Sequence, residues 1–291
     1  MAQSVLADLL EDLRCPICSG PLGAVPDGPV LRCGRGHSFD VARHGYVALL
    51  DGRSAALRAD TADMVAARLR VHDSGFLAPV VDATAEVVDQ LVGAADAPLI
   101  ADLGGGPGAY LRACRRRTPA IRGVVFDLSK FCARAAVRGD PPVAGIVADV
   151  WRHIPVRTDA AAVALSVFAP RNIPETARAL SAGGHLVIVT PQPDHLRELV
   201  GPLGMLSVAP DKDERLDASL AGVFTVTDRR GVRSVTSVCA ATIADLVAMG
   251  PSAFHHDRTQ IDEAAAALAD AHGGTVEVTC AVTITICQLV S

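Results

Sequence analysis

A glycine-rich turn between an apolar run and a helix-like segment constrains this chain more than any other stretch of its sequence. Residues 98–101 are apolar, Asp102-Leu-Gly-Gly-Gly-Pro-Gly108 follows, and residues 109–114 can form the first turns of a helix. A strand that enters a helix through glycines lets backbone N–H groups approach a bound nucleotide without collisions with Cβ atoms. The stretch therefore predicts a cofactor loop.

Two classes of cofactor fit this loop. Gly104-x-Gly106-x-x-Ala109 satisfies the loose dinucleotide fingerprint, which would suit a nicotinamide-dependent oxidoreductase. Asp102-x-Gly104-x-Gly106-x-Gly108 satisfies the pattern of S-adenosylmethionine methyltransferases. A strand-to-helix turn that merely requires glycine is a third interpretation, and the loop alone leaves all three open.

Apolar runs that resemble buried strands continue after the loop, at residues 123–127, 145–148, 160–167 and 185–190. The first ends in Asp127, a carboxylate that could accept both ribose hydroxyls of a nucleoside. The second is followed by Asp149, which suits an adenine amino group. Either acid could instead be a solvated strand end or a helix cap. Continuous apolar strands that alternate with helices predict a parallel sheet covered on both faces.

The last third of the chain predicts an antiparallel edge for this sheet. We expect a strand over residues 223–238 that is interrupted at 228–231, and helices over 240–249 and 261–271. A final strand over 275–289 has the alternating Thr and Val pattern of antiparallel pairing. A charged segment at 211–215 is expected to be irregular. Such an edge favours a methyltransferase over a dehydrogenase, which should continue with a parallel second half.

A second motif lies near the N-terminus, where Cys15-Pro-Ile-Cys18 and Cys33-Gly-Arg-Gly-His37 place three thiols and one imidazole on two tight turns. This is the ligand set of a closed tetrahedral structural zinc site. The alternatives are unrelated buried cysteines and a redox-active Cys-x-x-Cys pair, but no thioredoxin-like βαβ pattern surrounds it. The chain has eight cysteines, and the other five are expected to be core residues.

These patterns predict an α/β chain of three parts. A zinc-binding, RNA-recognition module spans 1–50 and a helical linker region 51–97, with helices from Thr61 to Val71 and from Ala78 to Val92. A class I S-adenosylmethionine methyltransferase domain spans 98–291, with a Rossmann-like, mostly parallel sheet and an antiparallel edge. Residues 38–47 hold two aromatics, Phe39 and Tyr46, which either contact RNA or cover the small module.

The composition argues against a secretory signal and a membrane span. The first residues carry acids and no basic region, and no apolar run approaches a membrane span, so we expect a cytoplasmic protein with no membrane partner. The formal net charge of −5 does not mark a nucleic-acid binder, although a local basic face is compatible with it.

Several segments together resemble the bacterial large-subunit ribosomal RNA guanine-N1 methyltransferases, which include macrolide-resistance enzymes from producers of tylosin-like antibiotics. The resemblance covers nearly the whole chain. Within the family, the sequence is similar to the resistance branch at Asp149-Val-Trp151 and Val167-Phe-Ala-Pro-Arg171-Asn172. The matching motifs are Cys15-Pro-Ile-Cys18, Cys33-Gly-Arg-Gly-His37-Ser-Phe-Asp40-Val-Ala-Arg-His-Gly45-Tyr46-Val, Asp102-Leu-Gly-Gly-Gly-Pro-Gly108, Phe168-Ala-Pro170, and Thr190-Pro-Gln-Pro-Asp-His195-Leu-x-Glu198-Leu199.

The resemblance implies methyl transfer from S-adenosylmethionine to N1 of a guanine in a domain II hairpin of 23S rRNA, near the macrolide site. It also implies a homodimer whose zinc modules and catalytic domains form an RNA cleft. By the family pattern, zinc is held by Cys15, Cys18, Cys33 and His37, and the cofactor by Gly104, Gly106, Asp127 and Asp149.

We expect the residues that act on the acceptor to lie in the segment after the fourth strand and in the Pro-x-x-x-His-Leu signature. Phe168 could stack on an extruded guanine and Asn172 could hydrogen-bond its edge, although Phe168 could equally be a core residue. Guanine N1 carries a proton that must be lost, and Asp194 and His195 are the candidates for the base.

Two other classes of function remain open at this point. A zinc-containing RNA-binding or regulatory protein with an inactive methyltransferase fold would share the cofactor loop. A small-molecule methyltransferase would share the cofactor half but has no evident use for the zinc module.

Overall fold

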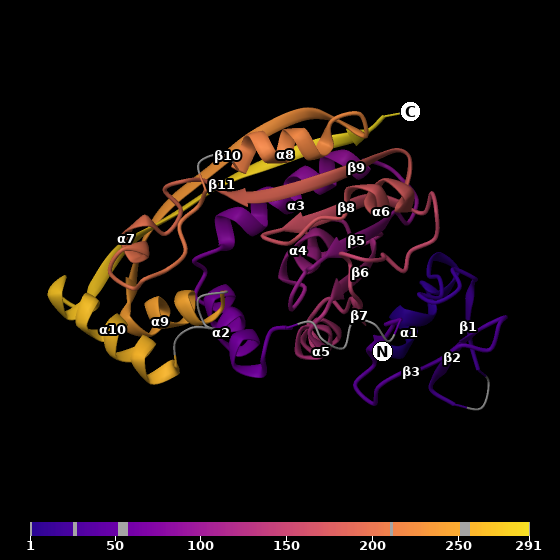
Figure 1. The fold of residues 1–291 in the computed structure, drawn as a ribbon, viewed down its shortest axis with the longest axis horizontal. Coiled ribbons are helices and arrows are strands. Elements are labelled where there is room, and N and C mark those ends of the chain that lie inside the picture. The colour runs from indigo at the N-terminus through magenta and orange to yellow at the C-terminus, as the bar shows by residue number, and fades with distance from the viewer. Residues whose placement is uncertain (1, 26–27, 52–57, 210–211, 251–256, 291) are drawn as a thin grey trace.

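The computed structural model describes residues 2–25, 28–51, 58–209, 212–250 and 257–290, and its centre is an eight-stranded sheet (Figure 1). The strands of this sheet, in chain order, are β4 (Val47–Ala48), β5 (Leu99–Leu103), β6 (Arg122–Asp127), β7 (Ala144–Val147), β8 (Ala161–Val167), β9 (Leu180–Pro191), β10 (Phe224–Cys239) and β11 (Thr275–Leu289). Their spatial order is β10-β11-β9-β8-β5-β6-β7-β4.

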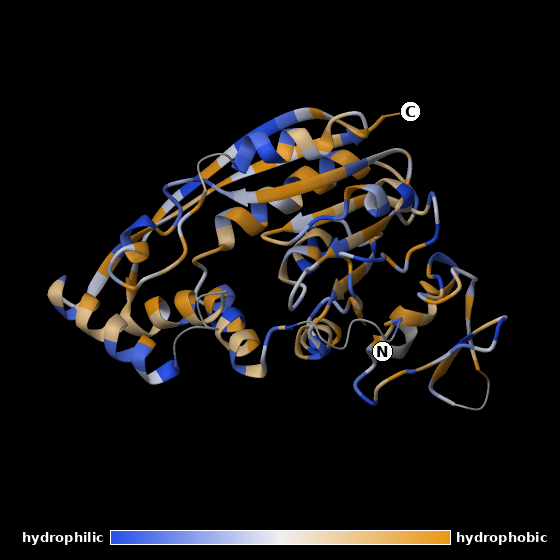
Figure 2. Ribbon diagram, viewed as in Figure 1, coloured by the Kyte–Doolittle hydropathy of each residue, from blue (hydrophilic) through white to orange (hydrophobic). Residues whose placement is uncertain are grey.

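The sheet is parallel from β4 to β9, and β11 and β10 add an antiparallel edge. This arrangement confirms the predicted fold class, a mostly parallel class I methyltransferase sheet with an antiparallel edge. It also corrects one detail, because β10 is not interrupted at residues 228–231. The strand continues through a β-bulge between Val226 and Asp228, and the charged residues there lie on the exposed outer edge of the sheet (Figure 2). Exposed polar side chains do not prevent an edge strand from pairing on its inner side.

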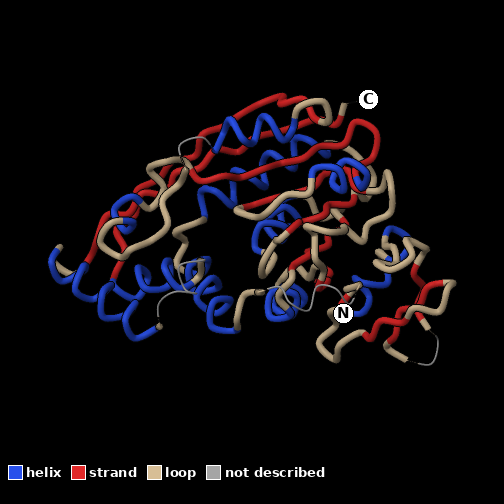
Figure 3. Tube along the Cα trace, in the orientation of Figure 1, coloured by secondary structure: helices blue, strands red, loops and turns tan. Residues whose placement is uncertain are grey.

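Side chains alternate between two hydrophobic clusters, one on each face of the sheet. Val125 lies in the first cluster, whereas its neighbours Val124 and Phe126 lie in the second, as the two-residue period of a strand requires. Helices on both sides complete the layers (Figure 3). The first cluster includes residues of α2 (Ala62–Asp73), α3 (Ala78–Val92), α4 (Ala109–Arg117), α5 (Lys130–Arg138), α9 (Ala240–Ala248) and α10 (Arg258–Ala271); the second includes α1 (Ala2–Ala7), α6 (Ile173–Ala179) and α8 (Lys212–Leu220).

The helices before the cofactor loop confirm their predicted positions. The Thr61 hydroxyl accepts a hydrogen bond from the Met64 N–H at 3.3 Å and caps α2, and α3 ends where Gly93 follows. Residues 52–57 of the expected linker lie outside the described residues. The segment predicted to be irregular at 211–215 is instead largely helical from Lys212, because Leu216 and Leu220 bury one face of α8.

The N-terminal module carries its own small antiparallel sheet of β1 (Leu22–Ala24), β2 (Val30–Cys33) and β3 (Ser38–Asp40). Phe39 is buried in this module and belongs to the same hydrophobic cluster as Phe126 of the large sheet. Of the two roles considered for Phe39, covering the module's interior is the one that the structure shows. The module therefore packs directly on the sheet.

The connection from β7 to β8 shows why the module can pack there. Parallel strands are usually joined by a crossover helix, but residues 148–160 form no helix. Module residues lie beside this connection instead: the Arg14 N–H donates to the Pro155 carbonyl at 3.1 Å, and the Arg157 N–H donates to the Asp12 carbonyl at 2.7 Å. The predicted domain boundaries at 50 and 97 stay predictions.

None of the helices in the described part of the chain is both long enough and apolar enough to cross a membrane.

Candidate active site and metal centre

The cofactor loop lies where the chain changes direction across the sheet. β5 pairs with β6 on one side and β8 on the other, so the segments after β5 and β8 diverge and leave a crevice at the carboxyl ends of the strands. Gly104 has φ +69°, and a Cβ there would lie 2.7 Å from the Cβ of Ala169. Only glycine fits that position, because a side chain would meet both backbone strain and the loop after β8.

A cavity of about 560 Å³ occupies this crevice, which is in the range of small-molecule sites. Its walls come from the cofactor loop, the ends of β6, β7 and β8, helix α2 and the end of α9. The predicted site residues that line it are Gly104, Gly106, Asp127, Asp149, Phe168 and His195. Asp102, Gly108, Asn172 and Asp194 do not.

Asp127 stands at the end of β6 with its carboxylate fixed by backbone N–H groups. One oxygen accepts from the Gly106 N–H at 3.0 Å and the other from the Ser129 N–H at 2.8 Å. Burial raises the pKa of this carboxyl, while these N–H groups oppose the shift. Each oxygen can accept a second hydrogen bond, and Asp127 lines the cavity, so the geometry is compatible with ribose hydroxyls.

Asp149 follows β7 and is buried, and one of its carboxylate oxygens accepts from the Trp151 N–H at 3.2 Å. Trp151 also lines the cavity, yet the residue is 64% exposed. An exposed indole beside a buried acid gives this end of the cavity a flat apolar surface next to a polar one.

Asp102 lies beneath the loop rather than in the cavity. Its side chain is fully buried, and a Cβ at Gly105 would overlap the carboxylate. Neither carboxylate oxygen has a hydrogen-bond partner among the described residues. Burial, together with the nearby charge of Asp127, raises the pKa of Asp102 to about 7. Gly108, with φ +80°, is the N-cap residue of α4, so both residues shape the loop without lining the cavity.

The lining of the cavity also includes an aromatic pair. Phe168 follows β8 with φ +51°, a strained value for a residue with a side chain, and the residue is 43% exposed. It stacks on His195 with ring centroids 5.7 Å apart and an angle of 28° between the planes. Of the two roles considered for Phe168, this exposure excludes a plain core position.

The other two acceptor candidates do not line the cavity, and each has a structural partner. Asn172 caps α6: its side-chain oxygen accepts from the Glu175 N–H at 3.2 Å, and its amide donates to the Trp151 carbonyl at 2.6 Å. Asp194 forms an ion pair with Arg233 of β10. Both side chains would have to leave these contacts to act on a substrate.

Sequence reasoning missed Arg68 and His72, which reach the cavity from α2. The Arg68 guanidinium pairs with Asp60 at 2.6 Å and donates to the Met249 carbonyl at 2.7 Å. Burial lowers the pKa of His72 to about 4, and the Arg68 charge adds to the shift. No spacing in the sequence distinguishes these residues from those on the solvent face of a helix.

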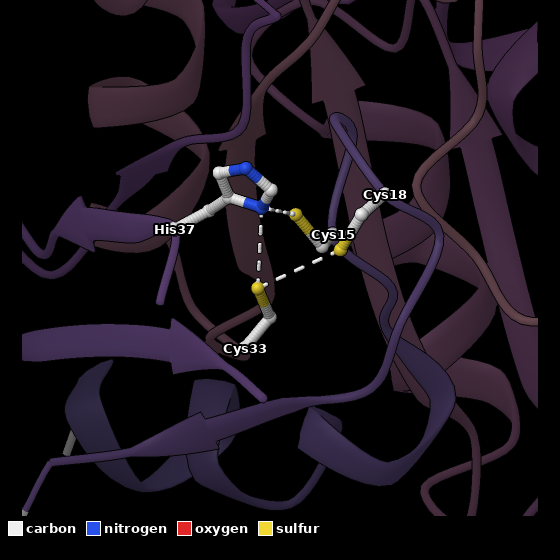
Figure 4. Close-up of side chains that lie close together, drawn as sticks. All are labelled: Cys15, Cys18, Cys33 and His37. Atoms are coloured by element: carbon white, nitrogen blue, oxygen red, sulfur yellow. Dashed lines mark hydrogen bonds between the residues drawn. The ribbon is translucent and has the colours of Figure 1, made fainter. Parts of the chain in front are cut away.

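The four zinc-ligand candidates converge in the N-terminal module (Figure 4). All four donor atoms lie within 4.8 Å of one another. The His37 Nδ1 atom is 3.5 Å from Cys15 Sγ and 3.3 Å from Cys33 Sγ, and the Sγ atoms of Cys18 and Cys33 are 3.6 Å apart. Bond lengths of about 2.0–2.3 Å to zinc give tetrahedral edges of about 3.3–3.8 Å, so the donor set fits zinc in geometry and chemistry.

Tight backbone turns hold these donors. The Cys15 N–H donates to the Gly20 carbonyl at 2.8 Å, and the Gly36 N–H donates to the Cys33 carbonyl at 2.9 Å. Gly36 has φ +86°, a value that glycine adopts without strain. Burial opposes ionisation of Cys33, but the backbone N–H groups of Arg35 and His37 lower its pKa to about 6, which favours the thiolate that binds metal.

Known proteins match this chain over almost its whole length. It is 43% identical to the 23S rRNA (guanine(748)-N(1))-methyltransferase of Streptomyces fradiae over 281 residues, which cover 97% of this chain and 98% of that protein. It is 39% identical to a protein of Micromonospora griseorubida described as a putative 23S rRNA (guanine-N(1)-)-methyltransferase, over 90% of this chain and 94% of that protein.

The chain belongs to the 23S rRNA (guanine-N1-)-methyltransferase family. An RlmA N-terminal zinc-ribbon model matches residues 13–52, and an O-methyltransferase domain model matches residues 80–190. The chain is therefore an S-adenosylmethionine-dependent methyltransferase with a zinc ribbon, and both predicted cofactors are confirmed at this level. The acceptor is a property of the site and not of the fold.

Proposed function

We propose that this methyltransferase modifies N1 of a guanine in a domain II hairpin of 23S rRNA and thereby confers resistance to tylosin- or mycinamicin-type macrolides. The observation that carries the proposal is the pair of exposed aromatics, Trp151 and Phe168, in the wall of the cofactor cavity. Flat rings at the mouth of such a cavity suit a base that is extruded from an RNA hairpin. The two relatives described above, a 23S rRNA guanine-N1 methyltransferase and a putative one, support this acceptor.

The chain's own groups supply binding and alignment. The loop at Gly104 and Gly106, with Asp127 and Asp149, would hold the nucleoside part of the cofactor. S-adenosylmethionine, when bound, supplies an electrophilic methyl group. Phe168 would stack on the guanine and direct its N1 toward that group, since correct alignment alone contributes much of such a rate enhancement.

The proton on guanine N1 must leave before or during attack. Of the two residues considered for the base, Asp194 is ion-paired with Arg233 outside the cavity lining, and only His195 lines the cavity. The cavity lining supports Phe168 and His195 as the residues that contact the guanine. Asn172 would need to give up its capping role to take part.

The decisive experiment is primer extension on 23S rRNA from cells with and without the protein. We expect a new stop beside one guanine in a domain II hairpin, together with growth at higher concentrations of tylosin. Gly104→Ala should remove both effects and abolish binding of S-adenosylhomocysteine in calorimetry. Gly75→Ala is the matched control, because Gly75 has φ +79° but open space around its Cβ position.

Other outcomes would identify another function. Binding of S-adenosylhomocysteine without RNA methylation would indicate a small-molecule acceptor, whereas no binding would indicate an inactive fold that only contacts RNA.

We further propose that the enzyme acts in the cytoplasm as a homodimer whose modules and catalytic domains form an RNA cleft. The family resemblance supports this assembly. Light scattering of the purified enzyme should give twice the mass of one chain, and a monomer that is fully active on RNA would contradict the proposal.

A further inference from the structure

The segment after β9 is fastened to β11 by side chains spaced three residues apart. The Gln192 side-chain amide donates to the Val282 carbonyl at 3.2 Å. The Glu198 carboxylate accepts from the Thr279 N–H at 2.9 Å and from its hydroxyl at 2.7 Å. The segment between them is thereby held in one position against the strand.

His195 provides the middle bond of this series. Its Nδ1 atom accepts a hydrogen bond from the Ala281 backbone N–H at 3.2 Å. A backbone N–H can only donate, so Nδ1 carries no proton and the proton of the neutral imidazole is on Nε2. The ring lines the cavity, and within the described part of the chain Nε2 has no hydrogen-bond partner.

The surroundings keep this imidazole neutral. Burial lowers the pKa of His195 to about 4, and the positive charge of Lys212 acts in the same direction. The ring is therefore a neutral donor at physiological pH. A neutral imidazole accepts a proton only at its bare nitrogen, and here that nitrogen faces Ala281 rather than a substrate.

We propose that His195 donates a hydrogen bond from Nε2–H to O6 of the target guanine and does not remove the N1 proton. This rests on the proposed function. Guanine presents O6 as the acceptor next to N1, whereas its N2 amino group is a donor. When N1 loses its proton, the negative charge spreads onto O6, and a fixed donor there stabilises the reacting anion.

The aromatic pair provides a site for this contact. A centroid separation of 5.7 Å at 28° means that His195 covers only part of the Phe168 ring. A guanine stacked parallel to the uncovered part would be inclined by 28° to the imidazole, an angle that still allows a hydrogen bond from Nε2–H to the edge of the base. The N1 proton passes to solvent water, the N1 electron pair forms the N–CH₃ bond, and the electrons of the broken C–S bond remain on sulfur.

Two substitutions of His195 distinguish a hydrogen-bond donor from a general base. His195→Gln keeps a donor near the position of Nε2 but cannot take a proton at neutral pH. His195→Asn keeps an acceptor near Nδ1 for the Ala281 N–H but loses the donor. His272→Gln, at an exposed histidine after α10, is the control for the substitution itself. Each protein is assayed by single-turnover methylation of a 23S domain II hairpin, with S-adenosylhomocysteine binding and thermal unfolding as checks on folding.

We expect His195→Asn to slow methylation by about 10²-fold, as loss of one transition-state donor does, and His195→Gln to remain within about tenfold of the unsubstituted enzyme. The rate should rise with pH along the same curve in the Gln variant and the unsubstituted enzyme. Equal loss in both variants with intact cofactor binding would overturn the proposal in favour of a base, and full activity of His195→Asn would also overturn it. If the unsubstituted enzyme does not methylate the hairpin, the proposed function has failed instead.

Discussion

Asp102 is a fully buried carboxylate to which the described residues give no hydrogen bond. Such a group is costly in its charged form, which is why burial and Asp127 raise its pKa to about 7. The glycine at 105 makes room for it directly beneath the cofactor loop. Ionised Asp102 therefore lowers the stability of the free enzyme and places a negative charge beneath the cofactor loop.

Replacing Asp102 by Asn should stabilise the protein at high pH. A folded pKa above the unfolded value of 3.8 means that the wild-type chain loses stability as pH rises from about 4 to about 7. The Asn variant lacks this loss, so the difference in unfolding free energy should grow over that interval to about 2–4 kcal/mol. Urea unfolding at pH 4.5, 6 and 8 measures it.

Asp270→Asn, at an exposed position of α10, is the matched control and should show no such trend. A variant at Asp102 that is less stable at every pH would mean that the carboxylate is hydrogen-bonded in solution.

Residues whose role depends on local spacing could be predicted from the sequence. The zinc ligands and the glycines at 104 and 106 belong to that kind, because a tight turn fixes its own geometry. The donor role of His195 could not be, since it depends on the Ala281 N–H of a strand far along the chain. The ion pair of Asp194 with Arg233 could not be predicted from the sequence for the same reason.

At the scale of elements, a polar network joins the zinc module to α6. The Arg14 guanidinium contacts Glu175 at 3.0 Å, and Glu175 also accepts from Arg178 at 2.8 Å and from the Ile154 N–H at 2.9 Å. Because α6 begins at the Asn172 cap, this network connects the module to the segment that follows β8. The module can therefore influence how that segment is held.

Replacing Arg14 by Met should loosen this connection. Its side chain is only 12% exposed, and loss of its contacts with Glu175 should lower the unfolding free energy by about 1–3 kcal/mol. Arg138→Met, at an exposed position of α5, should leave stability nearly unchanged. Chemical denaturation checks both variants, and equal stability of the two would show that the network does not join the elements.

Elements with strong periodicity could be predicted almost to the residue, as the helix over 78–92 and the strand over 275–289 show. α8 could not, because its charges outnumber the two leucines that bury one face. Cys239 likewise lies exposed before α9 and is not the core residue expected. In both cases tertiary position, which sequence does not display, decides exposure.

At the scale of the whole molecule, the zinc module and the large sheet share one hydrophobic cluster. Leu13 and Leu31 of the module lie in the same cluster as Phe126 and Ile146 of the sheet. β4 extends the sheet itself by pairing with β7. The sequence predicts a separate module, and this shared core could not be predicted, because contacts between distant elements leave no pattern in the local sequence.

Removal of zinc should therefore lower the stability of the whole enzyme and not only that of the module. Chelation at neutral pH should lower the midpoint of thermal unfolding of the entire enzyme, because metal binding supplies folding free energy to the small module that covers one sheet face. Calorimetry with and without chelator measures this, with zinc added back as the control. Separate transitions, with the catalytic domain unchanged, would contradict it.

The long exposed strand β10 has a consequence for assembly. An open strand edge invites pairing with another chain, and charged side chains discourage it. β10 carries Arg229, Arg230 and Arg233 along its length, while the opposite edge, β4, has only two residues. Neither border of the sheet is suited to edge-to-edge growth, so the enzyme is protected against aggregation there, and the proposed dimer would have to form through another surface.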